Sequence, residues 1–167
     1  MSDYCVLVAG GAHARFYTLD RIEFPELESG PKLIKRRELF NPLKETAGRD
    51  RYADAKIGRG RAARGGSAHS YDDYRSRHDD ESDRRFARRI LENVARLARS
   101  HRARSVILMT PVHMLGLLRH ELDIMSKRGM EVRKVAKDMT KFSSKEIHDY
   151  LAKEQLLPPC KGPEIVS

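Results

Sequence analysis

Two short runs of apolar residues constrain the fold of this chain more than any other feature. Tyr4–Ala9 (YCVLVA) and Ser105–Thr110 (SVILMT) carry apolar side chains at consecutive positions instead of alternate ones. Such a run is typical of a strand that is buried on both faces, inside a sheet that helices cover. The two runs therefore predict an α/β protein with these strands in the interior of its sheet.

Two further strands are expected between the apolar runs. Gly10 and Gly11 interrupt the first run, and Arg15–Asp20 (RFYTLD) resumes with strand-forming residues, which indicates a hairpin. Lys32–Phe40 (KLIKRRELF) is more charged, as expected of a strand near an edge of the sheet.

Three helices are expected in the second half of the chain. The first begins at Asp79 and places one apolar stripe on the core: Phe86, Ile90, Val94 and Leu97. We interpret the acidic residues near its start as helix caps, and the arginines near its end as complements of the helix dipole. The acidic residues are Asp79, Asp80, Glu81 and Asp83, and the arginines are Arg96, Arg99 and Arg102.

The second helix follows Pro111, which suits a first helical turn, and ends near Gly129. Its expected core stripe is Leu115, Leu118, Leu122 and Met125. Glu131–Ala136 then forms a fifth strand. Ser143 and Glu146 have the spacing of a capping box, so a third helix begins there.

The order βββ, long loop, αβαβα predicts a ribonuclease H-like mixed five-stranded sheet with helices on its faces. Right-handed crossovers place the strand at residues 106–109 beside the first strand. We expect a single domain over residues 1–157, with a flexible basic loop at about residues 44–78, and a C-terminal tail over residues 158–167.

The overall charge favours a polyanionic partner. Lys and Arg number 33 against 24 Asp and Glu, a formal net charge of +9, and the isoelectric point is about 9.8. No apolar run is long enough to span a bilayer, and Cys5–Ala9 is too short for the core of a signal peptide. The two cysteines do not make a disulfide framework. We therefore expect a cytoplasmic protein without membrane insertion.

The long loop is the candidate nucleic-acid interface. Residues 56–70 contain four basic residues and no acid, and glycines alternate with the arginines, which leaves the guanidinium groups free to reach phosphates. Tyr71 and Tyr74 follow, and their rings could stack on bases. The candidate residues are Arg59, Arg61, Arg64, Gly65, Gly66, Ser67, His69, Tyr74, Arg75 and Arg77. The alternative is a solvated segment that has no partner.

Four stretches of the sequence resemble the bacterial host attachment protein family, whose members are described as required for attachment to host cells. They are Leu7–Phe16 (LVAGGAHARF), the helix around Arg85–Ala87 (RFA), Pro111 with Leu115–Arg119 (LGLLR), and Val135–Thr140 (VAKDMT). The family typically has Asp at the position of Gly10. The resemblance covers most of the chain outside the loop, and it implies a role connected with attachment.

That family resembles in turn the central domain of class 1 translation release factors of archaea and eukaryotes. The release-factor domain carries a Gly-Gly-Gln loop between its third strand and first long helix, and Arg64-Gly65-Gly66-Ser67-Ala68 stands at the corresponding place. The glutamine, which positions water for ester hydrolysis, is missing here. The resemblance therefore implies a ribosome-related protein without the hydrolytic residue.

Catalytic and cofactor sites find little support in the sequence. The strands carry too few acids at their ends for a two-metal nuclease site. No metal-binding spacing of His and Cys occurs, and Gly58–Gly66 lacks the Gly-Lys-Ser/Thr of a phosphate-binding P-loop. We expect no catalytic residue, no metal and no cofactor.

The sequence is compatible with three functions. The first is a non-catalytic module that binds RNA or the ribosome through the basic loop. The second is an intracellular protein that supports attachment by binding another protein. A hydrolase or nuclease is the third and the least supported. Neither the identity of the partner nor the oligomeric state follows from the sequence.

Overall fold

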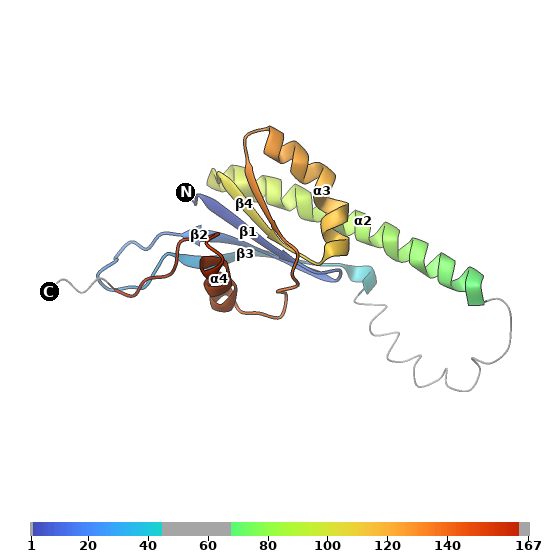
Figure 1. Cartoon of the computed structure of the whole chain (residues 1–167), viewed down its shortest axis with the longest axis horizontal. Coiled ribbons are helices and arrows are strands. Elements are labelled where there is room, and N and C mark those ends of the chain that lie inside the picture. Colours follow the sequence, from blue (N-terminus) through green and yellow to red (C-terminus); the bar gives the residue numbers. More distant parts are fainter. Residues whose placement is uncertain (1, 45–67, 164–167) are drawn as a thin grey trace, which may run out of the picture.

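The structure, a computed structural model, describes residues 2–44 and 68–163, and for residues 68–79 it describes the backbone alone. Strands and helices alternate as the sequence predicts (Figure 1). The elements are β1 (Tyr4–Ala9), β2 (His13–Asp20), β3 (Lys32–Phe40), α2 (Ala68–His101), β4 (Ser105–Met109), α3 (Val112–Lys127), β5 (Glu131–Val135) and α4 (Ser144–Lys153).

The five strands form one mixed sheet in the order β3-β2-β1-β4-β5. The two apolar runs pair in parallel at its centre, with Leu7 opposite Leu108, while β1 pairs with β2 in antiparallel register, with Leu7 opposite Phe16. The charged strand β3 lies at one edge. This order confirms the predicted α/β class and the predicted position of β4 beside β1.

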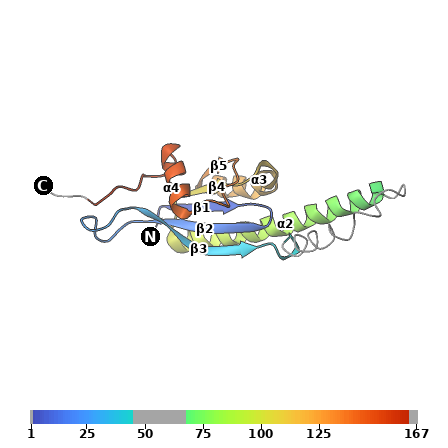
Figure 2. The same cartoon turned by 90° about the horizontal axis from the view of Figure 1, so that it is seen from below.

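Helices cover both faces of the sheet. Figure 1 shows α2 and α3 on one side and α4 on the other, and Figure 2 shows the same layers from below. Alternate residues of β1 serve the two cores: Cys5, Leu7 and Ala9 pack toward the side of α2 and α3, and Val6 and Val8 pack toward the side of α4. All five are buried, which explains the continuous apolar run.

The first long helix begins earlier than the sequence indicated. α2 has 34 residues and starts at Ala68, so residues 68–78, which we expected in the loop, are helical. The first turns of α2 project beyond the sheet (Figures 1 and 2). A helical segment with no sheet to pack against needs no apolar stripe, and its periodicity therefore gave no signal.

The core stripe of α3 also differs by one position from the prediction. Met114, Leu118 and Leu122 are its buried residues, while Leu115 and Met125 are only partly buried. The predicted ends of this helix are confirmed: Pro111 precedes its first turn, and Gly129 lies just beyond its last, with φ +96°.

Each of the three helices ends in a left-handed residue of a Schellman motif, in which the last carbonyls accept hydrogen bonds from amides beyond the helix. The amide of Ala103 donates to the carbonyl of Ala98 at 2.9 Å, and that of Met130 donates to Met125 at 3.2 Å. The left-handed residues are Arg102 (φ 51°), Gly129 (φ 96°) and Gln155 (φ 59°). Only one of them is glycine, the residue that this conformation favours.

The C-terminal helix begins as predicted, and the chain after it is held at two points. Ser143 and Glu146 form a capping box. The buried His148 of α4 lies 2.7 Å from the carbonyl oxygen of Pro158. Farther along the chain, Lys161 exchanges two backbone hydrogen bonds of 2.9 Å with Gly30. None of the helices described is both long enough and apolar enough to cross a membrane.

Candidate functional site

The predicted loop residues fall in two groups. Arg59, Arg61, Arg64, Gly65, Gly66 and Ser67 lie outside the described residues. His69, Tyr74, Arg75 and Arg77 belong to the first three turns of α2, where only the backbone is described. Because these four residues are helical, they form part of a regular element and not of a continuous loop.

An ion pair on a buried carboxylate joins the segment after β3 to α2. Nζ of Lys44 lies 2.8 Å from Oδ1 of Asp83, and Nε2 of His113 lies 3.2 Å from Oδ2 of the same carboxylate. The side chain of Asp83 is 4% exposed. We predicted a helix cap for the acidic residues at 79–83, and this was wrong, because α2 starts at Ala68, about three turns before Asp79. Asp83 instead bridges three elements of the fold.

Hydrogen bonds next to this ion pair fix the same junction. Nδ2 of Asn41 donates to the hydroxyl of Ser82 at 3.1 Å and to the carbonyl of Gly11 at 3.3 Å. Asn41 and Ser82 are both buried. A Cβ atom on Gly11 would lie 3.0 Å from Nζ of Lys44, so the backbone after β1 closely approaches the ion pair.

This polar junction lies beyond the carboxyl ends of β1 and β4, where α/β proteins commonly bind ligands. Asp83 and His113 have the arrangement of a base and the carboxylate that orients it. However, among the residues described, no hydroxyl or thiol donates a hydrogen bond to His113, and no three His, Cys, Asp or Glu side chains gather as metal ligands. The contacts of the junction hold α2 and α3 in place beside the end of the sheet.

The two cysteines are free and lie in different environments. Burial raises the pKa of the Cys5 thiol to about 12, which keeps it protonated and inert at neutral pH. Cys160 is exposed, beyond α4.

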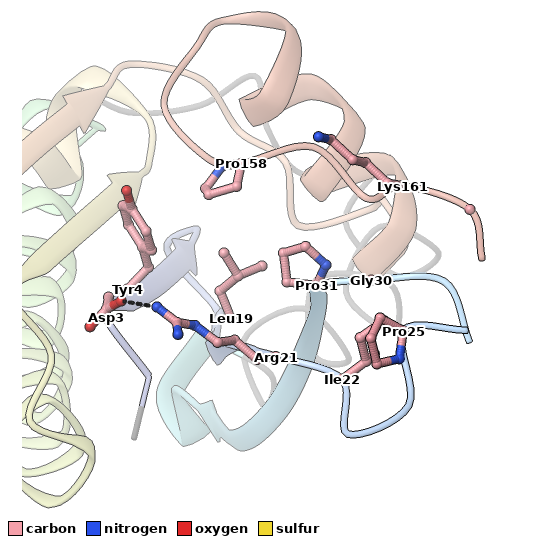
Figure 3. A pocket seen from close by; sticks show the side chains of 11 residues that line it. Asp3, Tyr4, Leu19, Arg21, Ile22, Pro25, Gly30, Pro31, Pro158 and Lys161 are labelled. Atoms are coloured by element: carbon pink, nitrogen blue, oxygen red, sulfur yellow. Dashed lines mark hydrogen bonds and ion pairs between the residues drawn. The ribbon is translucent and has the colours of Figure 1, made fainter. Parts of the chain in front are cut away.

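At the opposite end of the central strands, where β1 begins and β2 ends, a pocket of about 340 Å³ lies under the C-terminal segment (Figure 3). Its walls are mainly apolar, from Leu19, Ile22 and three prolines, and its polar groups are the ion pair of Arg21 with Asp3 (3.3 Å) and the rim residue Lys161. Arg21 is already neutralised by Asp3, so the pocket offers little charge to select a ligand.

A second hollow, of about 510 Å³, lies between the ends of α2 and α3. Four arginines line it, Arg99, Arg102, Arg104 and Arg128, and no acidic residue does. Its apolar lining consists of alanines and methionines: Ala95, Ala98, Ala103, Met125 and Met130.

The positive charge of the chain is concentrated on the second half of α2 and the turn that follows it. Residues 84–104 contain eight arginines and one glutamate, a net charge of +7 within a chain of +9. Five exposed arginines of α2 follow one another at helical spacing on the side opposite Phe86, Ile90 and Val94: Arg85, Arg88, Arg89, Arg96 and Arg99. We call these five residues the α2 stripe.

Most of this charge is not neutralised by neighbouring side chains. Within the stripe, Arg85 pairs with Glu81 at 2.6 Å, and Glu92 interrupts the row. No carboxylate among the described residues pairs with Arg88, Arg96 or Arg99. The stripe is thus a basic surface in which, among the described residues, Arg85 alone has a carboxylate partner, and it is some 20 Å long from the rise of a helix.

Sequence reasoning missed both the arginine-lined hollow and the buried ion pair. A count of charge along the chain would have placed the excess at residues 84–104 and not at 56–70. The position of Asp83, on the same helical face as Ala87, Ile90 and Val94, also carried a signal, because an acid on an apolar stripe must find a partner.

Comparison with known proteins gives one result. A family described as "Protein required for attachment to host cells" matches residues 5–151, most of the chain. No curated protein matches the sequence significantly.

Proposed function

The chain belongs to the family of proteins required for attachment to host cells. We propose that it is a non-catalytic RNA- or ribosome-binding module of the cytoplasm. The observation that carries the proposal is the α2 stripe. Exposed arginines without carboxylate partners bind phosphate groups well, because each guanidinium offers several donors in a fixed plane.

The likeness to release factors belongs to the same proposal. Arg64-Gly65-Gly66-Ser67-Ala68 lacks the glutamine that the release-factor loop uses, so we propose binding without ester hydrolysis. In this proposal Arg59, Arg61 and Arg64 supply further contacts to phosphate groups.

The test is the salt dependence of RNA binding. For single strands, each phosphate contact contributes about 0.7 to the slope of log affinity against log salt concentration. The variant Arg88→Gln/Arg89→Gln/Arg96→Gln keeps helix propensity and removes three charges. It should weaken binding and flatten the slope by about 2.

A matched control removes three charges from elsewhere on the molecule. Lys141, Lys145 and Lys153 are exposed residues on and beside α4, which covers the other face of the sheet. Their replacement by Gln should lower RNA affinity only slightly. Equal losses in the two variants would indicate an effect of net charge alone, and no binding by the unaltered protein at low salt would refute the proposal.

A second candidate function is that of an intracellular interaction protein that supports attachment through a protein partner. The description of the family favours it. Co-purification from lysate with and without nuclease separates the two, because partners of an RNA-binding module are lost after nuclease treatment and direct protein partners are retained.

A further inference from the structure

The hollow between α2 and α3 brings together cations from separate parts of the chain. Arg99 comes from the last turn of α2, Arg102 and Arg104 from the turn before β4, and Arg128 from the end of α3. All four residues are exposed, and none has an ion-pair partner among the described side chains. The nearest acid in the sequence, Glu131, pairs instead with Arg133 at 2.8 Å.

Helix dipoles explain only part of this arrangement. The C-terminus of a helix carries roughly half a negative charge, which attracts arginine. Two helices end at the hollow, so their dipoles offset about one of the four positive charges. The last carbonyls are also occupied already, because the Schellman hydrogen bonds from Ala103 and Met130 use those of Ala98 and Met125. About three positive charges are left to face the hollow.

The backbone of Arg102 is also in an uncommon conformation, which it shares with Gln155 at the end of α4. Its φ of 51° is left-handed, whereas Gly129 occupies the equivalent place at the end of α3. An arginine in this conformation is strained, whereas a glycine would not be.

We propose that this hollow binds the terminal phosphate of a nucleotide. A terminal phosphate carries between 1.5 and 2 negative charges at neutral pH, more than an internal phosphodiester, and so neutralises converging arginines more completely. The alanines and methionines of the lining offer apolar contact for the attached nucleoside. The volume of about 510 Å³ is within the range of small-molecule sites.

The ligand is the 5′-phosphorylated end of an RNA or a free mononucleotide, which share this chemistry. The RNA form rests on the proposed function, since the α2 stripe would then hold the following internucleotide phosphates. Arg99 belongs to both the stripe and the hollow, so one continuous basic surface connects them.

The experiment compares a short single-stranded RNA with a 5′-phosphate and the same RNA with a 5′-hydroxyl. The unaltered protein should prefer the phosphorylated end at least tenfold, the effect of one charge-assisted hydrogen bond of ordinary strength. The variant Arg102→Gly/Arg104→Gln/Arg128→Gln should lose the preference, and the Arg88/Arg89/Arg96 variant should keep it at lower overall affinity. Thermal melts show whether the triple variant is folded. The single variant Arg104→Gln tests the same site with a smaller change.

Titration with adenosine 5′-monophosphate, with adenosine as control, separates the two ligand sources. Equal binding of both RNA ends with no binding of the monophosphate overturns the inference and leaves the proposed function standing. A preference that survives the triple variant overturns it as well. If no RNA binds, the proposed function fails, and the inference then holds only if the monophosphate binds and the triple variant abolishes that binding.

Discussion

Arg102 and Gly129 occupy equivalent positions at the ends of two neighbouring helices, with φ of 51° and 96°. Each is the residue at which its chain leaves the helix and turns toward the next strand. Glycine adopts this backbone readily, whereas arginine adopts it at a cost of roughly 1–2 kcal/mol. The chain therefore carries, at the end of its longest helix, a side chain that local stability disfavours.

Replacement of Arg102 by glycine should stabilise the protein. The substitution removes the left-handed strain and the repulsion from three other arginines. Together these gains in free energy exceed the favourable interaction with the helix dipole that is lost. We expect a net gain of about 1 kcal/mol, or a rise in Tm of about 2–4 °C for a chain of this size. Gln155→Gly, at the end of α4 with φ 59°, should give a similar rise without affecting phosphate binding. A fall in Tm for Arg102→Gly would show that the arginine stabilises the fold.

Loss of Lys44 should destabilise the protein more than loss of an exposed partner. In Lys44→Met the buried carboxylate of Asp83 keeps only His113, so we expect a loss of about 1–3 kcal/mol in the free energy of unfolding. In Arg85→Met the exposed pair with Glu81 is lost, at about 0.3–0.5 kcal/mol. Urea denaturation measures both, and equal effects would contradict a structural role for Lys44.

Two glycine-to-alanine substitutions should act in opposite directions. A Cβ atom on Gly30 would lie 2.5 Å from Cγ2 of Ile22, beside the pocket of Figure 3, so Gly30→Ala should cost about 1–3 kcal/mol. Gly116 is exposed within α3 with nothing within 4 Å, so Gly116→Ala should stabilise by about 0.4–1 kcal/mol. Thermal melts of both variants distinguish these outcomes from a uniform effect of alanine.

Asp20 should contribute to stability at neutral pH and lose that contribution in acid. Burial alone would raise the pKa of this carboxyl, but hydrogen bonds from Ser2 and Thr18, with the charge of Arg36, lower it below the ordinary 3.8. A lowered folded pKa stabilises the protein above the unfolded pKa, and the effect disappears as the pH falls from about 4 through the lowered value. The variant Asp20→Asn should therefore be less stable at pH 7 and should lose less stability as the pH falls below about 4. An unchanged acid transition would exclude Asp20 as its source.

The sheet could be predicted because its signals are local. The apolar runs at Tyr4–Ala9 and Ser105–Met109, the capping box of Ser143 and Glu146, and the glycine at position 129 each specify their own element. The start of α2 could not be found in this way, because its first turns project beyond the sheet and need no apolar face. The sequence predicts Leu115 as a core residue of α3, whereas the structure buries Met114, because apolar residues at both positions fit a helical stripe.

The candidate site was harder to predict, since it depends on contacts between distant segments. The partnership of Lys44 with Asp83 joins residues on either side of the segment at 45–67, and nothing in the local sequence selects that pair. The arginines of the hollow come from three segments, which only the docking of α2 on α3 brings together.

The parallel pairing of β1 with β4 means that the two halves of the chain share the middle of the molecule. Residues 2–44 supply three adjacent strands, and residues 68–163 supply the other two strands with all three long helices. The seam between these halves runs through the best-buried part of the sheet, from Cys5 beside Val106 to Val8 beside Met109. Each half exposes, without the other, an unpaired apolar strand edge. The two segments therefore bury this strand edge only when both are present, because β1 and β4 complete one sheet together.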